Sequence, residues 1–175
     1  IEREVLDQAI ARVDGLYGPD RRGLPAALVV ESEGWHVGVI GIVASRLVER
    51  YGRPAFVIGL DGDLGKGSGR SVPGVDLGAA VIAARQAGLL VNGGGHAMAA
   101  GLTIREGSFK FFKESFEAVA KNLMTEETLQ RQLVHDGFLD PEFMEPEFGA
   151  MLGNETWGQG FPAPVFFGEF EVLSQ

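Results

Sequence analysis

Two glycine-rich segments near the middle of the chain carry the residues best suited to hold a phosphate. The first is segment 65–71, GKGSGRS, in which glycines alternate with Lys66, Ser68 and Arg70, and Ser71 follows. Alternating glycines leave one side of an extended segment bare, so a ligand or another backbone can approach it closely. Ammonium, guanidinium and hydroxyl groups donate hydrogen bonds to phosphate oxygens. The alternative is a flexible hairpin with incidental basic groups, and the glycine content alone slightly favours that alternative.

The second segment, 92–101, reads NGGGHAMAAG. Its three consecutive glycines, which include Gly94 and Gly95, predict a tight loop whose backbone N–H groups form a concave anion-binding nest. His96 follows directly, where it can donate a hydrogen bond to a phosphate or act as an acid. A lone histidine is usually structural, but its position after a glycine triplet favours a functional role.

A third segment, 34–46, reads GWHVGVIGIVASR and predicts a helix whose small residues let it lie close against a sheet. Trp35 and His36 fall at the turn between a strand and this helix, where α/β proteins bind ligands. A packing role for both residues is at least as well supported. The chain has three histidines and no cysteine, and none of the histidines shows metal-ligand spacing, so no metal site is predicted.

The elements that must position these segments alternate along the chain. Hydrophobic periodicity and turn residues predict helices over 1–14, 37–51, 77–87 and 109–123, strands over 26–31, 55–60, 66–72 and 99–105, and a glycine loop over 92–95. Asp76 is the expected N-cap of the third helix. Strands alternating with helices predict an α/β layer structure.

Charge is distributed unevenly along the 175 residues. The whole chain has a net charge of -9, which argues weakly against nucleic acid as a partner. Segment 34–105 has seven basic and four acidic residues, whereas segment 126–175 has one basic and ten acidic residues. An acidic chain can therefore still present a basic face.

Composition also bears on where the protein resides. The absence of cysteine fits a reducing compartment, and no apolar run is long enough to span a membrane, so we expect a cytoplasmic protein. The chain begins with Ile1 in a helical pattern, which suggests a fragment that lacks its true N-terminus.

Taken in order, segments 34–58, 65–72 and 93–104 resemble the RecJ family of single-strand-specific DNA exonucleases, in the DHH phosphoesterase superfamily. They look like the DHH-associated domain that follows the catalytic DHH domain. Segment 153–166, GNETWGQGFPAPVF, looks like the start of that family's oligonucleotide-binding β-barrel. The glycine-triplet-histidine motif alone is shared by the wider superfamily, and a related module occurs in alanyl-tRNA synthetases.

The resemblance implies three parts in this chain. Residues 1–25 would be a linker helix from a missing catalytic domain, and residues 26–125 would be the DHH-associated, substrate-binding domain, with a mixed sheet flanked by helices. Residues 126–175 would begin an oligonucleotide-binding, OB-like β unit that is truncated.

The resemblance also implies a function. The family's members are 5′→3′ exonucleases that act on single-stranded DNA in repair and recombination, with two Mn²⁺ or Mg²⁺ ions that activate water. The Asp/His motifs that hold those ions are absent from this chain, so we expect the chain alone to bind no metal and to be inactive. Single-stranded DNA is the implied partner, with single-strand-binding protein as a second candidate.

Roles can be carried over by position onto this sequence. Arg70 and Ser71 would hold DNA phosphates, to which the residue chemistry adds Lys66 and Ser68. Gly94, Gly95 and His96 would face the cleft near the scissile phosphate, with His96 as the catalytic residue. Trp35 and His36 complete the expected substrate-binding set.

Two other functions remain open at this point. The first is a phosphodiesterase for short oligonucleotides or cyclic dinucleotides, although such enzymes generally end near the glycine-triplet domain and this chain continues with an acidic segment. The second is a non-catalytic RNA-binding module of the synthetase type, which would need a continuing synthetase or tRNA-binding region. No segment of the sequence suggests one.

Overall fold

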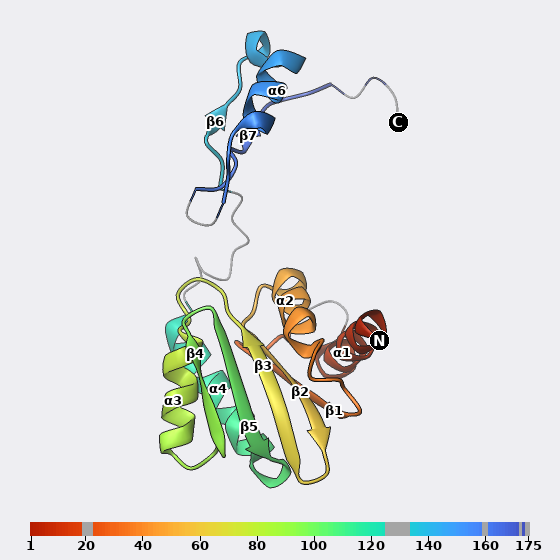
Figure 1. The fold of residues 1–175 in the computed structure, drawn as a ribbon, viewed down its shortest axis with the longest axis vertical. Helices are drawn as coiled ribbons and strands as arrows, with labels where there is room; N and C mark the ends of the chain where they lie inside the picture. The colour runs from red at the N-terminus through yellow and green to blue at the C-terminus, as the bar shows by residue number, and fades with distance from the viewer. Residues whose placement is uncertain (19–22, 125–133, 159–160, 172, 174–175) are drawn as a thin grey trace. The chain divides into compact units, whose positions relative to one another are not determined.

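A computed structural model of the chain describes residues 1–18, 23–124, 134–158, 161–171 and 173. It divides into two compact units, residues 1–131 and residues 132–175 (Figure 1). The expected division into 1–25, 26–125 and 126–175 stays a prediction. No helix among the described residues has the length and apolar character needed to cross a lipid bilayer.

The first unit is built on a five-stranded mixed sheet with the order β1-β2-β3-β5-β4. Its strands are β1 (Leu28–Glu33), β2 (Ala55–Asp61), β3 (Leu64–Arg70), β4 (Asn92–His96) and β5 (Ala99–Arg105). β1 pairs with β2 in parallel, and all other pairs are antiparallel. The expected fold class, a mixed sheet flanked by helices, is confirmed.

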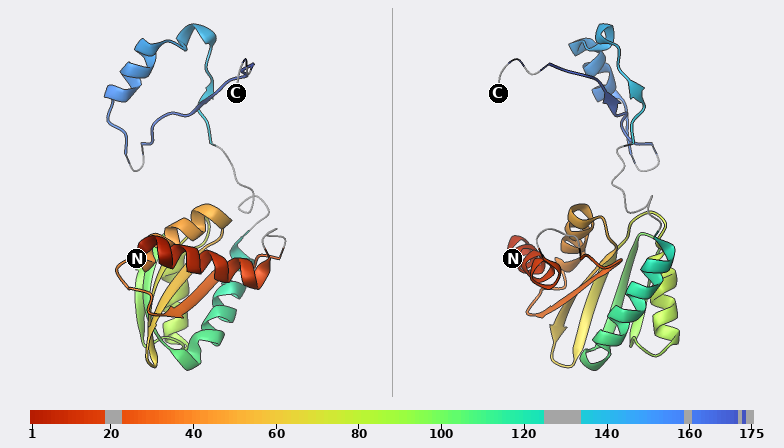
Figure 2. Two further views of the ribbon diagram at one scale, coloured as in Figure 1. Left: turned by 90° about the vertical axis from the view of Figure 1, so that its right-hand side faces the viewer. Right: turned by 180° about the vertical axis from the view of Figure 1, so that it is seen from behind.

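Four helices pack on this sheet: α1 (Glu2–Tyr17), α2 (Ile40–Tyr51), α3 (Leu77–Gln86) and α4 (Phe109–Leu123). α3 and α4 cover one face, where Phe56 of β2 meets Phe112 and Phe116 of α4 edge-to-face at centroid distances of 5.4 and 5.1 Å. α1 and α2 pack on the opposite face over β1 and β2, around Leu28 and Leu47. Figure 1 looks onto this second face, where α1 and α2 leave β5 and β4 uncovered and the first turn of α2 approaches β3, and Figure 2 shows α3 and α4 behind the sheet.

Local signals explain most of these boundaries. The Asp76 carboxylate accepts a hydrogen bond from the Ala79 N–H at 2.9 Å, which confirms it as the cap of α3. Gly52 ends α2 in the left-handed conformation with φ 63°. β1 and β3 are shifted by about two residues from their expected positions, and α2 begins at Ile40 rather than at Val37.

The glycine triplet is the element that the sequence analysis got wrong. Residues 93–95 belong to strand β4, paired with β5, and none of them has positive φ, so they form no anion-binding nest. The reason is close packing. A Cβ at Gly93 would lie 2.7 Å from Val81 of α3, and a Cβ at Gly95 would lie 2.4 Å from the Ala99 carbonyl oxygen. The strand therefore needs glycine at both positions.

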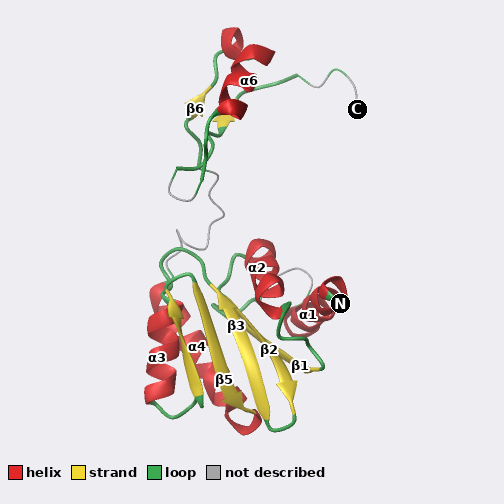
Figure 3. Ribbon diagram, in the orientation of Figure 1, coloured by secondary structure: helices red, strands yellow, loops and turns green. Residues whose placement is uncertain are grey.

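The second unit contains short elements only (Figure 3). Strands β6 (Gly137–Phe138) and β7 (Phe166–Phe167) pair in parallel, and helix α6 (Pro146–Asn154) lies between them in the chain. The Trp157 indole donates to the Leu152 carbonyl at 2.8 Å. None of this unit's described residues is buried. The expected OB-like barrel stays a prediction.

Candidate functional site

The alternation of side chains along β3, β5 and β4 sorts these strands into two sets. One set faces α3 and α4 and includes the buried Ala100, Leu102 and Ile104. The other set faces away from α3 and α4, and we call it the open face. Its members are Leu64, Lys66, Ser68, Arg70, Asn92, Gly94, His96, Ala99, Gly101, Thr103 and Arg105.

The strand register arranges the open face in rows. Arg70 pairs with Ala99, which pairs with His96. Neighbouring strands lie about 4.8 Å apart, so the outer members of this row have backbones about 10 Å apart. The two residues that sequence reasoning put closest to a phosphate therefore share one row, with only the Ala99 methyl group between them.

Two further rows lie beside this one. The first contains Ser68, Gly101 and Gly94, and the second contains Lys66, Thr103 and Asn92. Successive rows are about 7 Å apart, because each is two residues further along a strand. The face thus has a row with almost no side chains between two rows that carry polar ones.

The Arg70 guanidinium is held in place by its surroundings. Its Nη1 donates to the Gly69 carbonyl at 2.9 Å and to Ser68 Oγ at 3.2 Å. The first turn of α2 comes close as well, since a Cβ at Gly41 would lie 3.1 Å from Arg70 Nη2. A half-buried, oriented guanidinium of this kind suits bidentate binding of a phosphate.

The glycines of the GKGSGRS segment serve packing rather than ligand access. A Cβ at Gly69 would lie 2.4 Å from the Phe56 ring, and a Cβ at Gly67 would lie 2.8 Å from Leu102. Both positions face α3 and α4. The structure thus gives these glycines a packing role in a central strand, where the alternative expectation was a flexible hairpin.

Two of the expected site residues are buried, and a third, Gly95, is exposed but would point an added Cβ into the sheet. Trp35 is 4% exposed, and its indole donates to Gln8 Oε1 at 2.8 Å. Ser71 is 5% exposed, and its hydroxyl donates to the Val75 carbonyl at 2.5 Å. Gly95 faces the Ala99–Ala100 backbone. As placed, these residues support the site by packing and present no group to a ligand on the open face.

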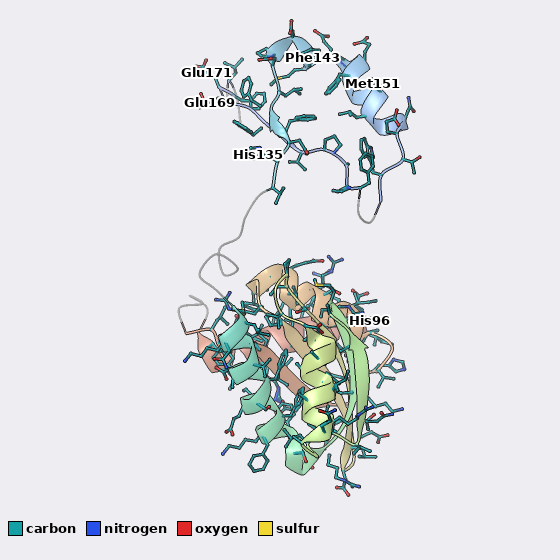
Figure 4. All side chains as sticks on the ribbon, turned by 90° about the vertical axis from the view of Figure 1, so that its left-hand side faces the viewer. His96, His135, Phe143, Met151, Glu169 and Glu171 are labelled. Carbon is teal, nitrogen blue, oxygen red and sulfur yellow. The ribbon has the colours of Figure 1, made fainter. Side chains whose placement is uncertain are left out.

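The remaining expected residues are accessible. His36 is exposed in the turn before α2, and its Nδ1 accepts a hydrogen bond from the Gly38 N–H at 3.0 Å, which leaves Nε2 to face a ligand. His36 and Lys66 line one shallow hollow of about 480 Å³. His96 is exposed on β4, and Figure 4 shows it on the side of the sheet opposite α3 and α4.

Sequence reasoning missed three polar members of the open face: Asn92, Thr103 and Arg105. The period of two in strand 99–105 could have revealed Thr103 and Arg105, because it places them on the same side as Gly101. β3, β4 and β5 together contain Lys66, Arg70, His96 and Arg105 but no aspartate or glutamate. The face is therefore basic within a chain that is acidic overall.

Strands β3, β4 and β5 have few side chains that could ligate a metal, since they contain one histidine and no aspartate or glutamate. Within the described ranges, no three His, Cys, Asp or Glu side chains lie close enough together to hold a metal ion. These residues do not fit a two-metal centre. The chemistry open to them is anion binding and hydrogen-bond donation.

Comparison with known proteins gives a consistent match. The DHHA1 domain model matches residues 25–122. The single-stranded-DNA-specific exonuclease RecJ of Escherichia coli K12 is 41% identical over 160 residues, which cover 89% of this chain and 28% of that protein. The RecJ of Haemophilus influenzae is 38% identical over 156 residues, 87% of this chain and 27% of that protein. The chain thus spans little more than a quarter of the length of these relatives.

Solved structures agree with the sequence comparison. The crystal structure of RecJ in complex with Mn²⁺ from Thermus thermophilus superposes with a TM-score of 0.74 at 28% identity, over 94% of this chain and 24% of that one. The crystal structure of exonuclease RecJ bound to manganese superposes with a TM-score of 0.58 at 30% identity, over 70% of this chain and 29% of that one. The chain therefore belongs to the DHHA1 domain family, in the form that the RecJ proteins carry.

Proposed function

We propose that the open face binds the sugar–phosphate backbone of single-stranded DNA, as the substrate-binding part of a metal-dependent 5′→3′ exonuclease of repair and recombination. The observation that carries this proposal is the basic, sparsely covered strip formed by Lys66, Arg70, His96 and Arg105 on three adjacent strands without acidic residues. Phosphate contacts supply most of the sequence-independent affinity for nucleic acids. The related proteins are named as exonucleases specific for single-stranded DNA.

Different roles follow from where each residue lies. Arg70 is the principal phosphate contact, because Ser68 and the Gly69 carbonyl already orient its guanidinium. Lys66 supplies a second cation two rows away. His96 shares the row of Arg70 and would donate a hydrogen bond to the phosphate that reacts. A donor that binds more strongly as charge develops affects turnover more than affinity.

The divalent ions of the reaction would be held outside this chain. RecJ structures contain Mn²⁺ or Mg²⁺, whereas the described residues of this chain do not fit a metal centre. The chain alone should therefore release no nucleotides from labelled single-stranded DNA in the presence of Mn²⁺. Nucleotide release that persists through repurification of the chain would contradict this assignment.

The binding role is tested by measuring the affinity of the chain for a labelled, 5′-phosphorylated oligothymidylate at low salt. Losing a charged hydrogen-bonded contact costs about 1.5–3 kcal/mol, so Arg70→Ala should weaken binding about tenfold or more. Arg70→Lys should recover only part of the affinity, because it restores the charge but not the planar fork. Lys110→Ala is the matched control, since Lys110 is exposed on α4, behind the opposite face.

His96 is tested in the complete enzyme. His96→Ala should lower the single-turnover cleavage rate while the affinity for DNA stays close to that of the unsubstituted enzyme. Normal binding by Arg70→Ala, or normal cleavage by His96→Ala, would show that the corresponding role is wrong.

A further inference from the structure

Gln8 of α1 is tied to the turn that carries His36, although the two residues are far apart in the chain. The turn, residues 34–39, connects β1 to α2, and Trp35 lies in it. The Trp35 indole N–H donates to Gln8 Oε1 at 2.8 Å, and the indole belongs to the same buried cluster as Val5 of α1. A buried indole N–H needs an acceptor. Gln8 is exposed on its helix, so packing alone does not account for a glutamine at this position.

The main chain of Trp35 is fixed as well as its side chain. A Cβ at Gly59 of β2 would overlap the Trp35 carbonyl oxygen, so the turn lies directly on this strand. Gly34 begins the turn in the left-handed conformation, with φ 76°. Trp35 is thus held by α1 through its side chain and by β2 through its backbone. These two contacts together set the direction in which the chain continues to His36.

His36 takes its orientation from the closed turn. Its Nδ1 accepts a hydrogen bond from the Gly38 N–H at 3.0 Å, and its carbonyl oxygen accepts one from the Val39 N–H at 3.0 Å. A Cβ at Gly38 would lie 3.0 Å from the same ring nitrogen, so the imidazole lies close over Gly38. A neutral histidine that accepts at Nδ1 carries its proton on Nε2. The turn therefore selects one tautomer, whose Nε2–H can donate to an acceptor such as a phosphate oxygen.

A second hydrogen bond joins α1 to α2 away from this turn. The Tyr51 hydroxyl donates to Asp14 Oδ1 at 2.9 Å, near the C-terminal ends of both helices. Neither residue lines the hollow of about 480 Å³ to which His36 and Lys66 belong. The bond from Gln8 reaches the residue next to His36, whereas the bond from Tyr51 joins helix to helix. The second bond therefore provides a matched control for the first.

We infer that Gln8 is a positioning residue for the candidate site, which holds the Trp35 indole and so keeps the turn closed and His36 in the Nε2–H tautomer. Without the acceptor, the buried indole N–H would be unpaired, and the turn would open until this group reached water. The inference rests on the proposed function only for its last step, the donation from His36 to DNA. It also makes the site sensitive to α1, because a shift of this helix would move the acceptor.

The positioning step is tested without DNA, from the NMR signals of the His36 ring nitrogens at about pH 8.5, where histidine is ordinarily neutral. The unsubstituted chain should show one protonated and one unprotonated nitrogen. Gln8→Met removes the amide acceptor but retains the length of the side chain, and it should give averaged signals from both tautomers. Gln8→Glu should restore the single tautomer, because a carboxylate oxygen also accepts from the indole. Tyr51→Phe, the control, should leave the His36 signals unchanged.

The affinity of the full chain for a labelled oligothymidylate tests the consequence for binding. Gln8→Met should weaken binding about threefold to tenfold, which is the effect of losing one hydrogen bond. It should have no further effect in a His36→Ala background, because both substitutions remove the same contact. Tyr51→Phe should lower the unfolding temperature without this loss of affinity.

Each outcome separates the inference from the function on which it rests. A single His36 tautomer in Gln8→Met would overturn the inference and leave the proposed function intact. Averaged signals in Tyr51→Phe would overturn it as well, because any loosening of α1 would then have the same effect. So would a loss of affinity from Gln8→Met that is equally large in the His36→Ala background.

Normal DNA binding by His36→Ala would instead contradict the contact between His36 and DNA, and the positioning of its ring by Gln8 would stand. If Gln8→Met fails to fold, Gln8→Ala makes the same comparison at this exposed helical position.

Discussion

On the side of β3, β5 and β4 that α3 and α4 cover, a Cβ added at any glycine would lie less than 3.0 Å from another atom. These glycines are Gly65, Gly67, Gly69, Gly93 and Gly95. On the open side, the nearest atom to an added Cβ at Gly94 or Gly101 lies 3.8 Å away or beyond. Glycine thus permits close packing on the covered side and leaves space on the open side. A larger side chain should therefore lower stability on the covered side and have little effect on stability on the open side.

The largest difference in stability is expected between the alanine variants of the neighbours Gly95 and Gly94. In Gly95→Ala the new methyl group would lie 2.4 Å from the Ala99 carbonyl oxygen and 2.5 Å from Ala100 Cα, and these backbone atoms cannot move without breaking the β4–β5 pair. We expect the free energy of unfolding to fall by about 3 kcal/mol or more. Gly94→Ala should change it by no more than about 0.5 kcal/mol.

Urea unfolding of the two variants measures this difference, provided that the slope with denaturant stays constant. Similar losses in both variants would mean that the register of β4 against β5 is wrong. The assignment of Gly94 to the open face would then fail.

The glycine triplet marks the limit of what the sequence alone could predict about the fold. Hydrophobic periodicity located the four helices and most strands of the first unit, and the Asp76 cap was a local signal that the structure confirms. The glycine triplet was expected to be a loop because no local signal predicts a strand there. Its strand conformation depends on α3, since a Cβ at Gly78 would lie 2.9 Å from the Gly95 carbonyl oxygen.

Some features of the candidate site could likewise be predicted from local sequence, whereas others depend on tertiary packing. Arg70 and His96 could be selected from local chemistry, but their shared row depends on the register of three strands that come from distant parts of the chain. The burial of Trp35 and Ser71 depends on partners elsewhere, such as Gln8 on α1 for the indole. Residue type therefore suggested the chemistry, whereas tertiary packing decided which side chains can reach a ligand.

Intermediate effects on stability and DNA affinity are expected when either of two serines in the GKGSGRS segment is replaced by alanine. Ser71→Ala removes the buried hydroxyl that bonds to the Val75 carbonyl, so the free energy of unfolding should fall by about 1–3 kcal/mol while DNA affinity is retained. Ser68→Ala should do the opposite, because Ser68 Oγ accepts a hydrogen bond from Arg70 on the open face. Its stability should change by no more than about 0.5 kcal/mol while DNA affinity falls.

Thermal unfolding and oligothymidylate binding, measured on both serine variants, test this reversal. If Ser71→Ala kept full stability and lost affinity, Ser71 would contact the DNA directly, as the family resemblance implies. The division between the two sides of the sheet would then need revision at that position.

The smallest effect on stability is expected from removing a charged side chain on the side of the sheet that α3 and α4 cover. Glu31 of β1 pairs with the inward-facing Ile58, and burial raises the pKa of its carboxyl group, although Arg12 and Lys113 oppose the shift. A carboxyl group whose pKa is higher in the folded protein stabilises the fold while protonated, and this stabilisation is lost as the pH rises through the folded-state pKa. At neutral pH the charged carboxylate therefore costs stability, in contrast to the exposed cations Lys66 and Arg105 of the open face.

Glu31→Gln should raise the free energy of unfolding at neutral pH by less than about 1 kcal/mol, because the side chain is only half-buried and solvent screens its charge. The gain should disappear in acid, where the original carboxyl group is protonated and also neutral. Urea unfolding across this pH range, with Glu33→Gln at the exposed end of the same strand as the control, provides the measurement. A loss of stability at neutral pH would instead show that attraction to Arg12 and Lys113 outweighs burial, and that the covered side of the sheet also gains stability from charge.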